Sequence, residues 1–321
     1  MQAIPLVPDD LASEVAIVTG ASRGLGLELA RELGRHSVRL VICARGASAL
    51  REAADQLRAD GAEVTAISCD ITEEPSARLL VDTALSAYGR LDIIVNNAGI
   101  IQVGPAASNQ FSDYESAIRT MALAPARLTL TALPVMRERG HGRILNITSI
   151  GGKISVPHLL PYCMAKFATV AFSEGLRAEL GSGPITVTTA VPGLMRTGSH
   201  EQAMFRGQRE KEFTWFSLGA SLPLISMDAT RAAKRIVSAM RGRRAEVILT
   251  PLGEVGARGA AIFPGITARV LHAVSLTLPN AADGSGELAR GEELRPALSG
   301  RLFDRLTTLG RSAARRLNEV R

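Results

Sequence analysis

The chain has 321 residues, of which 46% are hydrophobic, 21% charged and only 4% aromatic. This length suits one large α/β domain, or one domain with a modest extension, and the apolar share is sufficient for a sizeable core. The formal charge of +6 comes from lysines and arginines spread along the chain, without a basic block or interleaved aromatics. We therefore expect no nucleic-acid partner.

Short runs rich in Val and Ile alternate with helical patterns from Val15 to Leu249. The sequence predicts strands over 15–19, 38–43, 63–68, 91–95, 143–147, 185–191 and 246–249. Between them it predicts helices over 25–33, 47–60, 74–88, 114–139, 162–180 and 229–241, the fourth interrupted or kinked by Pro125 and Pro134. This alternation is typical of parallel strands joined by right-handed crossovers. We expect an α/β fold with a doubly wound parallel sheet (a Rossmann fold) that binds ligands beyond the carboxyl ends of its strands.

The alternation stops after Leu249, which predicts one catalytic domain over 13–250 and a C-terminal helical extension over 251–321. Residues 280–300 are rich in Gly, Ala, Ser, Glu and Pro, as a linker would be. Apolar residues at helical spacing over 302–317 predict an amphipathic helix. We favour docking of this helix on the protein or a partner over peripheral contact with a membrane.

The sequence favours a cytoplasmic protein without a transmembrane segment. Residues 1–13 lack the apolar core of a signal peptide, and no uncharged apolar run of 18 residues occurs. Cys43, Cys69 and Cys163 form no CxxC pair, which indicates reduced thiols. The five histidines show no metal-ligand spacing, so we expect no metal site.

A glycine-rich turn, Thr19-Gly20-Ala21-Ser22-Arg23-Gly24-Leu25-Gly26, lies between the first predicted strand and helix. Its glycines permit a tight turn, close approach of the backbone to a pyrophosphate, and packing of the helix on the sheet. The start of the helix then offers free N–H groups and a partial positive charge to phosphates. This position predicts a dinucleotide site.

The TGxxxGxG spacing resembles that of the short-chain dehydrogenase/reductase family. Four further blocks match in order: Asp70-Ile71, Asn96-Asn97-Ala98-Gly99, Ser149 with Tyr162-x-x-x-Lys166, and Pro192-Gly193-x-x-x-Thr197. The resemblance covers roughly residues 13–250. It implies an NAD(P)-dependent oxidoreductase that exchanges a hydride between the cofactor and a carbonyl or alcohol, in a homodimer or homotetramer.

The resemblance implies that the cofactor contacts the following residues: Gly20, Ser22, Arg23, Gly24, Leu25, Gly26, Arg45, Asp70, Ile71, Asn97, Ala98, Gly99, Tyr162, Lys166, Pro192, Gly193 and Thr197. Three of these positions have competing explanations. Asp70 could be a solvated loop residue, the Asn97 block could be purely structural, and Thr197 could cap a helix instead of fixing the nicotinamide carboxamide.

Arg45, just after the second predicted strand, decides between the two nicotinamide dinucleotides. An acidic residue there would bind the ribose hydroxyls and disfavour a 2′-phosphate. A guanidinium instead holds that phosphate through charge-assisted hydrogen bonds, and Arg23 is placed to assist. The sequence therefore predicts NADP(H) in preference to NAD(H), against the alternative of two surface arginines.

Tyr162 and Lys166 are four residues apart on a predicted helix and therefore share a face. We expect the ammonium to lower the pKa of the phenol, which is otherwise near 10. In carbonyl reduction Tyr162 would donate a proton to the oxygen, and Ser149 would orient that oxygen. The resemblance adds that Lys166 holds the nicotinamide ribose.

Met121 departs from the family pattern, because the resemblance places a catalytic Asn there that supports a water in the proton relay. The relay could be rerouted, slow or absent. This leaves open a second interpretation, a weakly active or inactive NADP-binding regulatory or scaffold protein. Intact Ser149, Tyr162 and Lys166 favour the enzyme.

Residues 200–224 lie where the family places a mobile substrate lid. They include Met204, Phe205, Phe213, Trp215, Phe216 and Leu218. Aromatic side chains over the site predict a bulky apolar substrate, such as a steroid-like, fatty-acyl or polyketide carbonyl. Alternatively, these side chains only pack the lid down.

Overall fold

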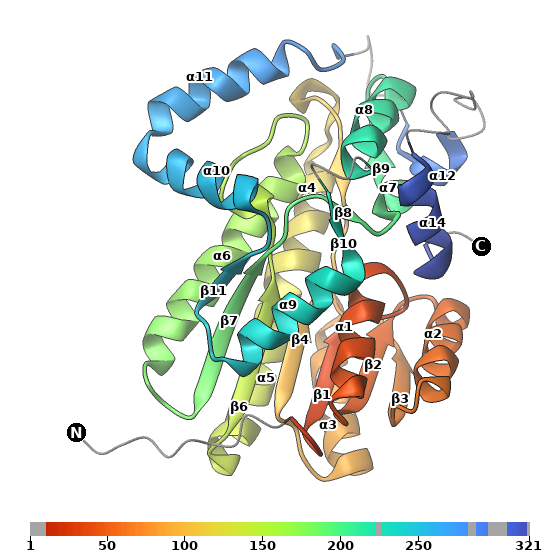
Figure 1. Cartoon of the computed structure of the whole chain (residues 1–321), viewed down its shortest axis with the longest axis vertical. Coiled ribbons are helices and arrows are strands. Elements are labelled where there is room, and N and C mark those ends of the chain that lie inside the picture. Colours follow the sequence, from red (N-terminus) through yellow and green to blue (C-terminus); the bar gives the residue numbers. More distant parts are fainter. Residues whose placement is uncertain (1–10, 222–225, 282–286, 295–306, 320–321) are drawn as a thin grey trace.

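A seven-stranded parallel sheet forms the centre of the computed structural model, which describes residues 11–221, 226–281, 287–294 and 307–319 (Figure 1). The strand order is β11-β7-β6-β4-β1-β2-β3, and neighbouring strands are parallel throughout. The strands are β1 (Val15–Thr19), β2 (Arg39–Ala44), β3 (Val64–Ser68), β4 (Ile93–Asn96), β6 (Gly142–Ile147), β7 (Ile185–Val191) and β11 (Glu246–Ile248). The expected doubly wound fold is confirmed.

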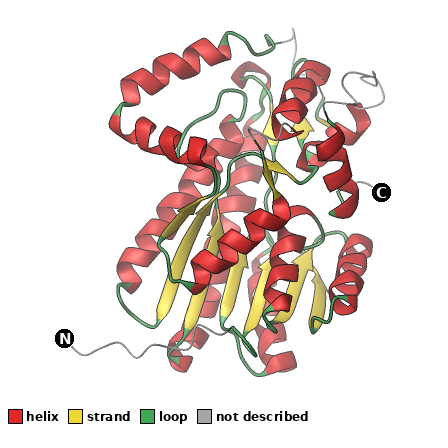
Figure 2. Ribbon diagram, viewed as in Figure 1, coloured by secondary structure: helices red, strands yellow, loops and turns green. Residues whose placement is uncertain are grey.

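Helices cover both faces of the sheet, as Figure 2 shows. One layer holds α1 (Gly24–Arg35), α2 (Ala47–Ala59) and α9 (Ala229–Arg241); the other holds α3 (Glu74–Tyr88), α5 (Ala124–Arg139) and α6 (Leu160–Leu180). Apolar side chains of the strands alternate between the two layers: Ala16 and Val18 pack toward α1 and α9, whereas Val15 and Ile17 pack toward α3 and α5. Each face of the sheet thus has its own core.

The helix predicted over 114–139 is divided differently from the expectation. Helix α4 (Phe111–Ile118) begins three residues earlier, because Gln110 and Asp113 form a reciprocal capping box. A π-helical turn, Arg119–Leu123, then joins α4 to α5. Pro125 follows this π turn within a continuous helical path, and the Met121 carbonyl, four residues before Pro125, accepts from the Thr169 hydroxyl at 2.6 Å. Helix α5 continues through Pro134, so the irregular turn lies just before Pro125.

Smaller elements gather beyond the carboxyl ends of the central strands. Strand β9 (Met204–Phe205) lies between β5 (Gln102–Val103) and β12 (Ala289–Arg290), and β8 (Met195–Arg196) pairs with β10 (Met227–Asp228). Helix α8 (Arg209–Ser221) accompanies them, together with four short helices: η1 (Ala106–Ser108), η3 (Ile150–Gly152), α7 (Ser199–Gln202) and α12 (Gly291–Leu294). Part of the stretch predicted as a linker, 289–294, is therefore ordered.

The remaining helices belong to the predicted extension. Two of them, α10 (Pro251–Ile262) and α11 (Pro264–Ser275), form a hairpin that projects from the body (Figure 1). Within the helix predicted over 302–317, the structure has α14 (Thr308–Arg316), and residues 302–306 lie outside the described part. Helix α14 packs against α8 and β8, so the extension returns to the main domain.

Candidate active site

A continuous cavity of about 790 Å³ lies at the carboxyl ends of the central strands. It runs from the glycine turn before α1, past the ends of β2 and β4, to the start of η3 and α6. Every residue that the sequence predicted for catalysis or cofactor contact lines this cavity. The topology thus brings the ordered sequence blocks to one place, as expected for ligands of an open parallel sheet.

The glycine turn provides a cradle that side chains would fill. Gly20 and Gly24 have positive φ angles of 66° and 58°, which glycine adopts without strain. A Cβ atom on Gly26 would collide with the carbonyl oxygen of Gly20 and the side-chain amide of Asn97. Helix α1 begins at Gly24, and its first three residues line the cavity, so the N-terminal end of the helix lies at this part of the site. These features fit a dinucleotide.

Asn97 ties the glycine turn to the central strands. Its side-chain amide donates to the carbonyl oxygens of Thr19, at 2.9 Å, and Gly20, at 3.2 Å. The Thr19 hydroxyl in turn accepts from the backbone N–H groups of Asn97 and Ala98. Asn97 therefore has the structural role that was one of its two explanations. It also lines the cavity, where a cofactor would contact it.

Arg45 and Asp70 face one another at the ends of β2 and β3. The Arg45 guanidinium is 69% exposed and lies 3.9 Å from the Asp70 carboxylate. Burial by itself would raise the pKa of Asp70, but hydrogen bonds from the Thr72 N–H and hydroxyl, together with Arg45, lower it. Asp70 is therefore held as an anion, and Arg45 keeps most of its donors open to solvent and to the cavity.

Ser149, Tyr162 and Lys166 come together at the other end of the cavity. Ser149 follows β6, and its hydroxyl accepts from the Gly151 N–H at 3.1 Å. Lys166 is buried, donates to the Ile147 carbonyl at 2.8 Å, and lies 5.7 Å from the centre of the Tyr162 ring. The shared helix face predicted from the spacing is confirmed.

The expected lowering of the Tyr162 pKa is wrong for this arrangement. Burial raises the pKa of the phenol to about 12 and outweighs the hydrogen bond with Ser149, which lowers it. The Lys166 ammonium is engaged by a backbone carbonyl, and burial lowers its own pKa to about 8. Desolvation of the two groups therefore dominates over their mutual electrostatic effect.

Met121 lies in the π-helical turn and is 1% exposed. It packs with Ala117 and Ala165, and its sulfur lies 3.3 Å from the position of a Cβ on Gly99. The neighbouring Thr120, and not Met121, lines the cavity. This turn, where the resemblance places an Asn, therefore brings Thr120 to the cavity and the Met121 thioether to the core.

Thr197 lies between the cavity and the start of helix α7. It is buried, lines the cavity, and its hydroxyl accepts from the Ser199 N–H at 3.1 Å at the start of α7. The N-cap residue of α7 is Gly198, however, so Thr197 stands one position before the cap and is not itself the N-cap that the alternative named.

The aromatic residues of the lid divide into two groups. Trp215 and Phe216 line the cavity, whereas Phe205 and Phe213 are fully buried and pack the lid down. Glu212, fully buried on α8, accepts from the Trp215 indole at 2.6 Å and lies 2.8 Å from His158 Nδ1. This carboxylate fixes α8 to the segment that precedes α6.

Sequence reasoning missed two charged residues that line the cavity, Arg290 of β12 and Glu319. Glu319 comes just after α14 and forms an ion pair with Arg23 at 3.4 Å. No motif marked this residue, because its place depends on how a distant segment folds back. Thr120 was also missed, although it adjoins the Met121 position.

Comparison with known proteins decides the family. The family model described as short chain dehydrogenase matches residues 14–206. The chain belongs to the short-chain dehydrogenase/reductase family. It is 40% identical over 189 residues to a putative ketoacyl reductase of Streptomyces coelicolor, covering 58% of this chain and 72% of that protein. It is also 30% identical over 250 residues to dehydrogenase/reductase SDR family member 7B of Danio rerio, covering 76% and 79%.

A solved structure supports the same assignment. An engineered variant of the actinorhodin polyketide ketoreductase, determined with NADPH, superimposes with a TM-score of 0.64 at 31% identity, covering 74% of this chain and 95% of that one. This short-chain dehydrogenase/reductase is thus an NAD(P)-dependent oxidoreductase that interconverts a carbonyl and an alcohol.

No group of three or more His, Cys, Asp or Glu side chains in the part of the chain that the structure describes could hold a metal ion. None of the helices in the described ranges combines the length and apolar character that crossing a membrane requires.

Proposed function

We propose that the protein is an NADP(H)-dependent reductase of bulky apolar carbonyl compounds, with Ser149, Tyr162 and Lys166 as its catalytic residues. The observation that carries the proposal is the continuous cavity. One end holds these three side chains, and the other holds the glycine turn with two arginines. A ligand that reaches both ends presents its reactive part to the phenol and its phosphates to the start of α1.

The chain's own groups supply proton transfer and orientation. A phenol with a pKa of about 12 stays protonated at neutral pH, so Tyr162 is available as the proton donor to the carbonyl oxygen. Ser149, adjacent to Tyr162, holds that oxygen. Lys166, anchored on the Ile147 carbonyl, is placed to bind the ribose and replenish the proton. The bound nicotinamide cofactor supplies the hydride.

The preference for NADP(H) rests on Arg45 and Arg23. Both line the cavity, and no acidic residue stands at the end of β2, Cys43-Ala44-Arg45. An exposed guanidinium at that place matches a 2′-phosphate in charge and geometry. The related ketoreductase structure that contains NADPH supports the same choice.

The substrate end of the cavity is apolar. Val156 and Leu159 line it together with Trp215 and Phe216 of the lid. These side chains favour a fatty-acyl, polyketide or steroid-like ketone over a small polar one. The relatedness to a putative ketoacyl reductase favours the acyl classes.

Tyr162→Phe tests the proposal, because it removes only the phenolic oxygen. We expect NADPH oxidation with a panel of hydrophobic ketones to fall by about 10²- to 10⁴-fold, with an unchanged melting temperature. Tyr114→Phe, on α4 and outside the cavity, is the matched control. Tight NADPH binding without turnover of any ketone would instead identify the scaffold alternative.

We further propose that the protein is cytoplasmic and a homodimer or homotetramer, paired through α4, α5 and α6. Large apolar side chains on these helices and the π turn are exposed: Phe111 (78%), Leu123 (52%), Leu130 (59%), Met164 (53%) and Phe167 (42%). Burying them in a second copy would remove this apolar surface from water. Leu130→Asp should reduce the mass in light scattering; an unchanged mass would exclude this interface.

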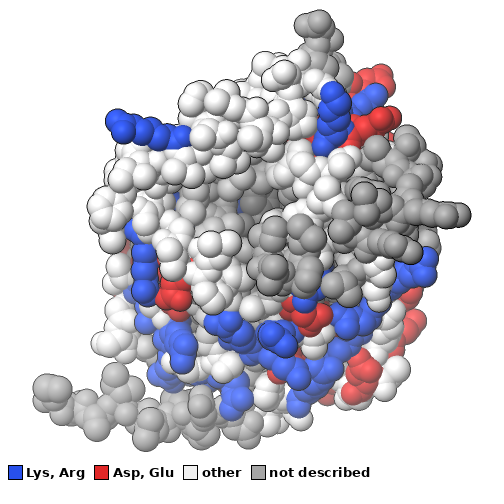
Figure 3. All heavy atoms as spheres, turned by 45° about the horizontal axis from the view of Figure 1, so that its top comes forward, with Lys and Arg blue, Asp and Glu red and all other residues white. Residues whose placement is uncertain are grey.

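The α10–α11 hairpin favours a second candidate, contact with a membrane surface. Helix α11 has no buried residue, and Leu252, Val255, Ile266 and Val270 are 55–71% exposed. The upper part of the face in Figure 3, which includes the hairpin, carries few charged side chains. Co-sedimentation with liposomes, lost in Val255→Asp, would establish this contact; a protein that remains in the supernatant would exclude it.

A further inference from the structure

The segment Leu317–Glu319 lies directly on the glycine turn. The Gly24 N–H, among the first of helix α1, donates to the Leu317 carbonyl at 2.9 Å. The Glu319 Oε1 lies 2.5 Å from where a Gly24 Cβ would stand, with the Thr197 side chain as a further neighbour of that point. Arg23 Nε lies 3.4 Å from Glu319 Oε2. A carbonyl oxygen and a carboxylate therefore occupy the start of α1.

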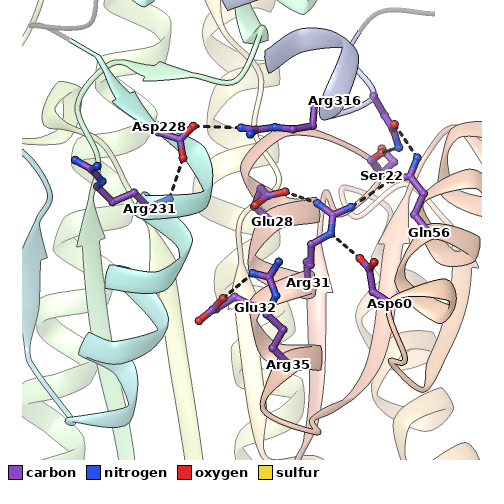
Figure 4. A network of polar contacts seen from close by, with 11 residues as sticks. Ser22, Glu28, Arg31, Glu32, Arg35, Gln56, Asp60, Asp228, Arg231 and Arg316 are labelled. Atoms are coloured by element: carbon purple, nitrogen blue, oxygen red, sulfur yellow. Dashed lines mark hydrogen bonds and ion pairs between the residues drawn. The ribbon is translucent and has the colours of Figure 1, made fainter. Parts of the chain in front are cut away.

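The contact is built from several independent attachments. Leu317 is fully buried and packs with Ala229 and Ala313. Arg316 pairs with Asp228 at 3.2 Å (Figure 4). The Glu319 carbonyl accepts from the Gln202 side chain at 2.7 Å.

Asn318 adds a link to the opposite side of the turn. Its side-chain oxygen accepts from Gln56 at 3.1 Å, and its amide lies 3.5 Å from the Ser22 carbonyl. Figure 4 shows Gln56 and Ser22 together beside the end of α14. The segment thus spans the glycine turn from α7 to α2.

The buried carboxylate of Glu319 has few groups that compensate its charge. Its side chain is 6% exposed, and among the described residues no hydrogen bond reaches Oε2. Arg23 is the cation that faces it, while Glu201, itself beside His200, adds a like charge. Burial and Glu201 raise the pKa of Glu319 to about 7 against the effect of Arg23. A buried carboxylate with one partly exposed partner is poorly compensated.

The groups that Leu317–Glu319 engages are those that a phosphate would use. Backbone N–H groups at the start of a helix after a glycine-rich turn bind pyrophosphate, and an adjacent arginine adds charge-assisted hydrogen bonds. The segment and a dinucleotide thus require the same donors, and an anionic Glu319 would repel the phosphates.

We propose that Leu317–Glu319 is an internal occupant of the phosphate part of the nucleotide site, and that Glu319 is a residue that sets the affinity for the cofactor. NADPH binds by displacing the segment, so its apparent affinity is reduced by the fraction of molecules in which the segment is in place. This inference rests on the proposed NADP(H) function. It gives the end of the C-terminal extension, Leu317–Glu319, a role in controlling cofactor affinity.

Titration calorimetry with NADPH on three chains tests the proposal: the intact chain, Glu319→Ala, and a chain shortened after Arg316. We expect the shortened chain to bind about tenfold more tightly or better, as for an open state populated at about 10% or less. Glu319→Ala should change affinity in the same direction and keeps the test valid if the shortened chain does not fold. Glu138→Ala, exposed at the end of α5, is the matched control.

Hydrogen exchange provides a readout that does not depend on activity. Adding NADPH to the intact chain should accelerate exchange in the peptide that covers 308–319, because the segment leaves its place. Unchanged or weaker affinity in both altered chains, or stronger protection of that peptide, would overturn the proposal while leaving the nucleotide function intact. Failure of all chains to bind NADPH or NADH would overturn the proposed function as well.

Discussion

Arg45 offers the sharpest test of cofactor choice, because its removal should affect one nucleotide and not the other. Its side chain is 69% exposed, and its ion pair with Asp70 spans 3.9 Å. An exposed pair of this kind contributes about 0–1 kcal/mol to stability, so Arg45→Ala should fold and melt close to the parent protein. A hydrogen bond to a charged group is worth about 1.5–3 kcal/mol, which corresponds to about 10- to 150-fold in Kd.

Because Arg45 is exposed to solvent, we expect its removal to change the Kd for NADPH by the smallest factor in this range. Fluorescence titration should show the Kd for NADPH rising about tenfold in Arg45→Ala, with the Kd for NADH unchanged. Arg51→Ala, an exposed arginine on α2 outside the cavity, should alter neither value. Equal loss of both nucleotides, or loss of neither, would refute the assignment of Arg45 to the 2′-phosphate.

Three further predictions address the glycine turn and the catalytic end. Gly26→Ala should lower the free energy of unfolding by about 1–3 kcal/mol, measured by urea denaturation, whereas Gly175→Ala, with open space around it, should not lower it. The rate of ketone reduction should fall as the pH rises through about 8, where Lys166 loses its charge, and Lys166→Arg should move that fall to higher pH; a flat profile would contradict a role for the ammonium. Met121→Asn should destabilise the fold by about 1–3 kcal/mol, because it buries an amide among apolar side chains; equal or higher stability would show that a partner for the amide is present.

Much of the site is encoded in short sequence blocks. Alternating strand and helix patterns predicted the order of elements from β1 to β11, because apolar periodicity is a local property of the chain. In a parallel sheet the residues that follow each strand meet at one edge. For that reason the sequence predicts that Gly26, Arg45, Ser149 and Thr197 share one site, and all four line the cavity.

Other features depend on burial, which no motif encodes. The pKa of Tyr162 rises because the surrounding chain excludes water, and the spacing to Lys166 carries no information about that. The division of the lid into Phe213, which packs inward, and Trp215, which lines the cavity, follows from how α8 is seated. The extension over 251–321 was predicted to be helical, but the exposure of α10 and α11 depends on tertiary structure: α11 has no buried residue and α10 has one, Ala257.

By itself, then, the sequence determined the doubly wound sheet, the glycine cradle and the Ser149–Tyr162–Lys166 group, since each is marked by a local residue pattern in a strand, a turn or a helix and the parallel topology brings these patterns together. Only the tertiary structure decided that Leu317 and Glu319 rest on the glycine turn. The physical reason is the sequence separation of the partners. Contacts between such distant segments arise from the packing of the whole chain, and neither segment alone has a pattern that indicates the other.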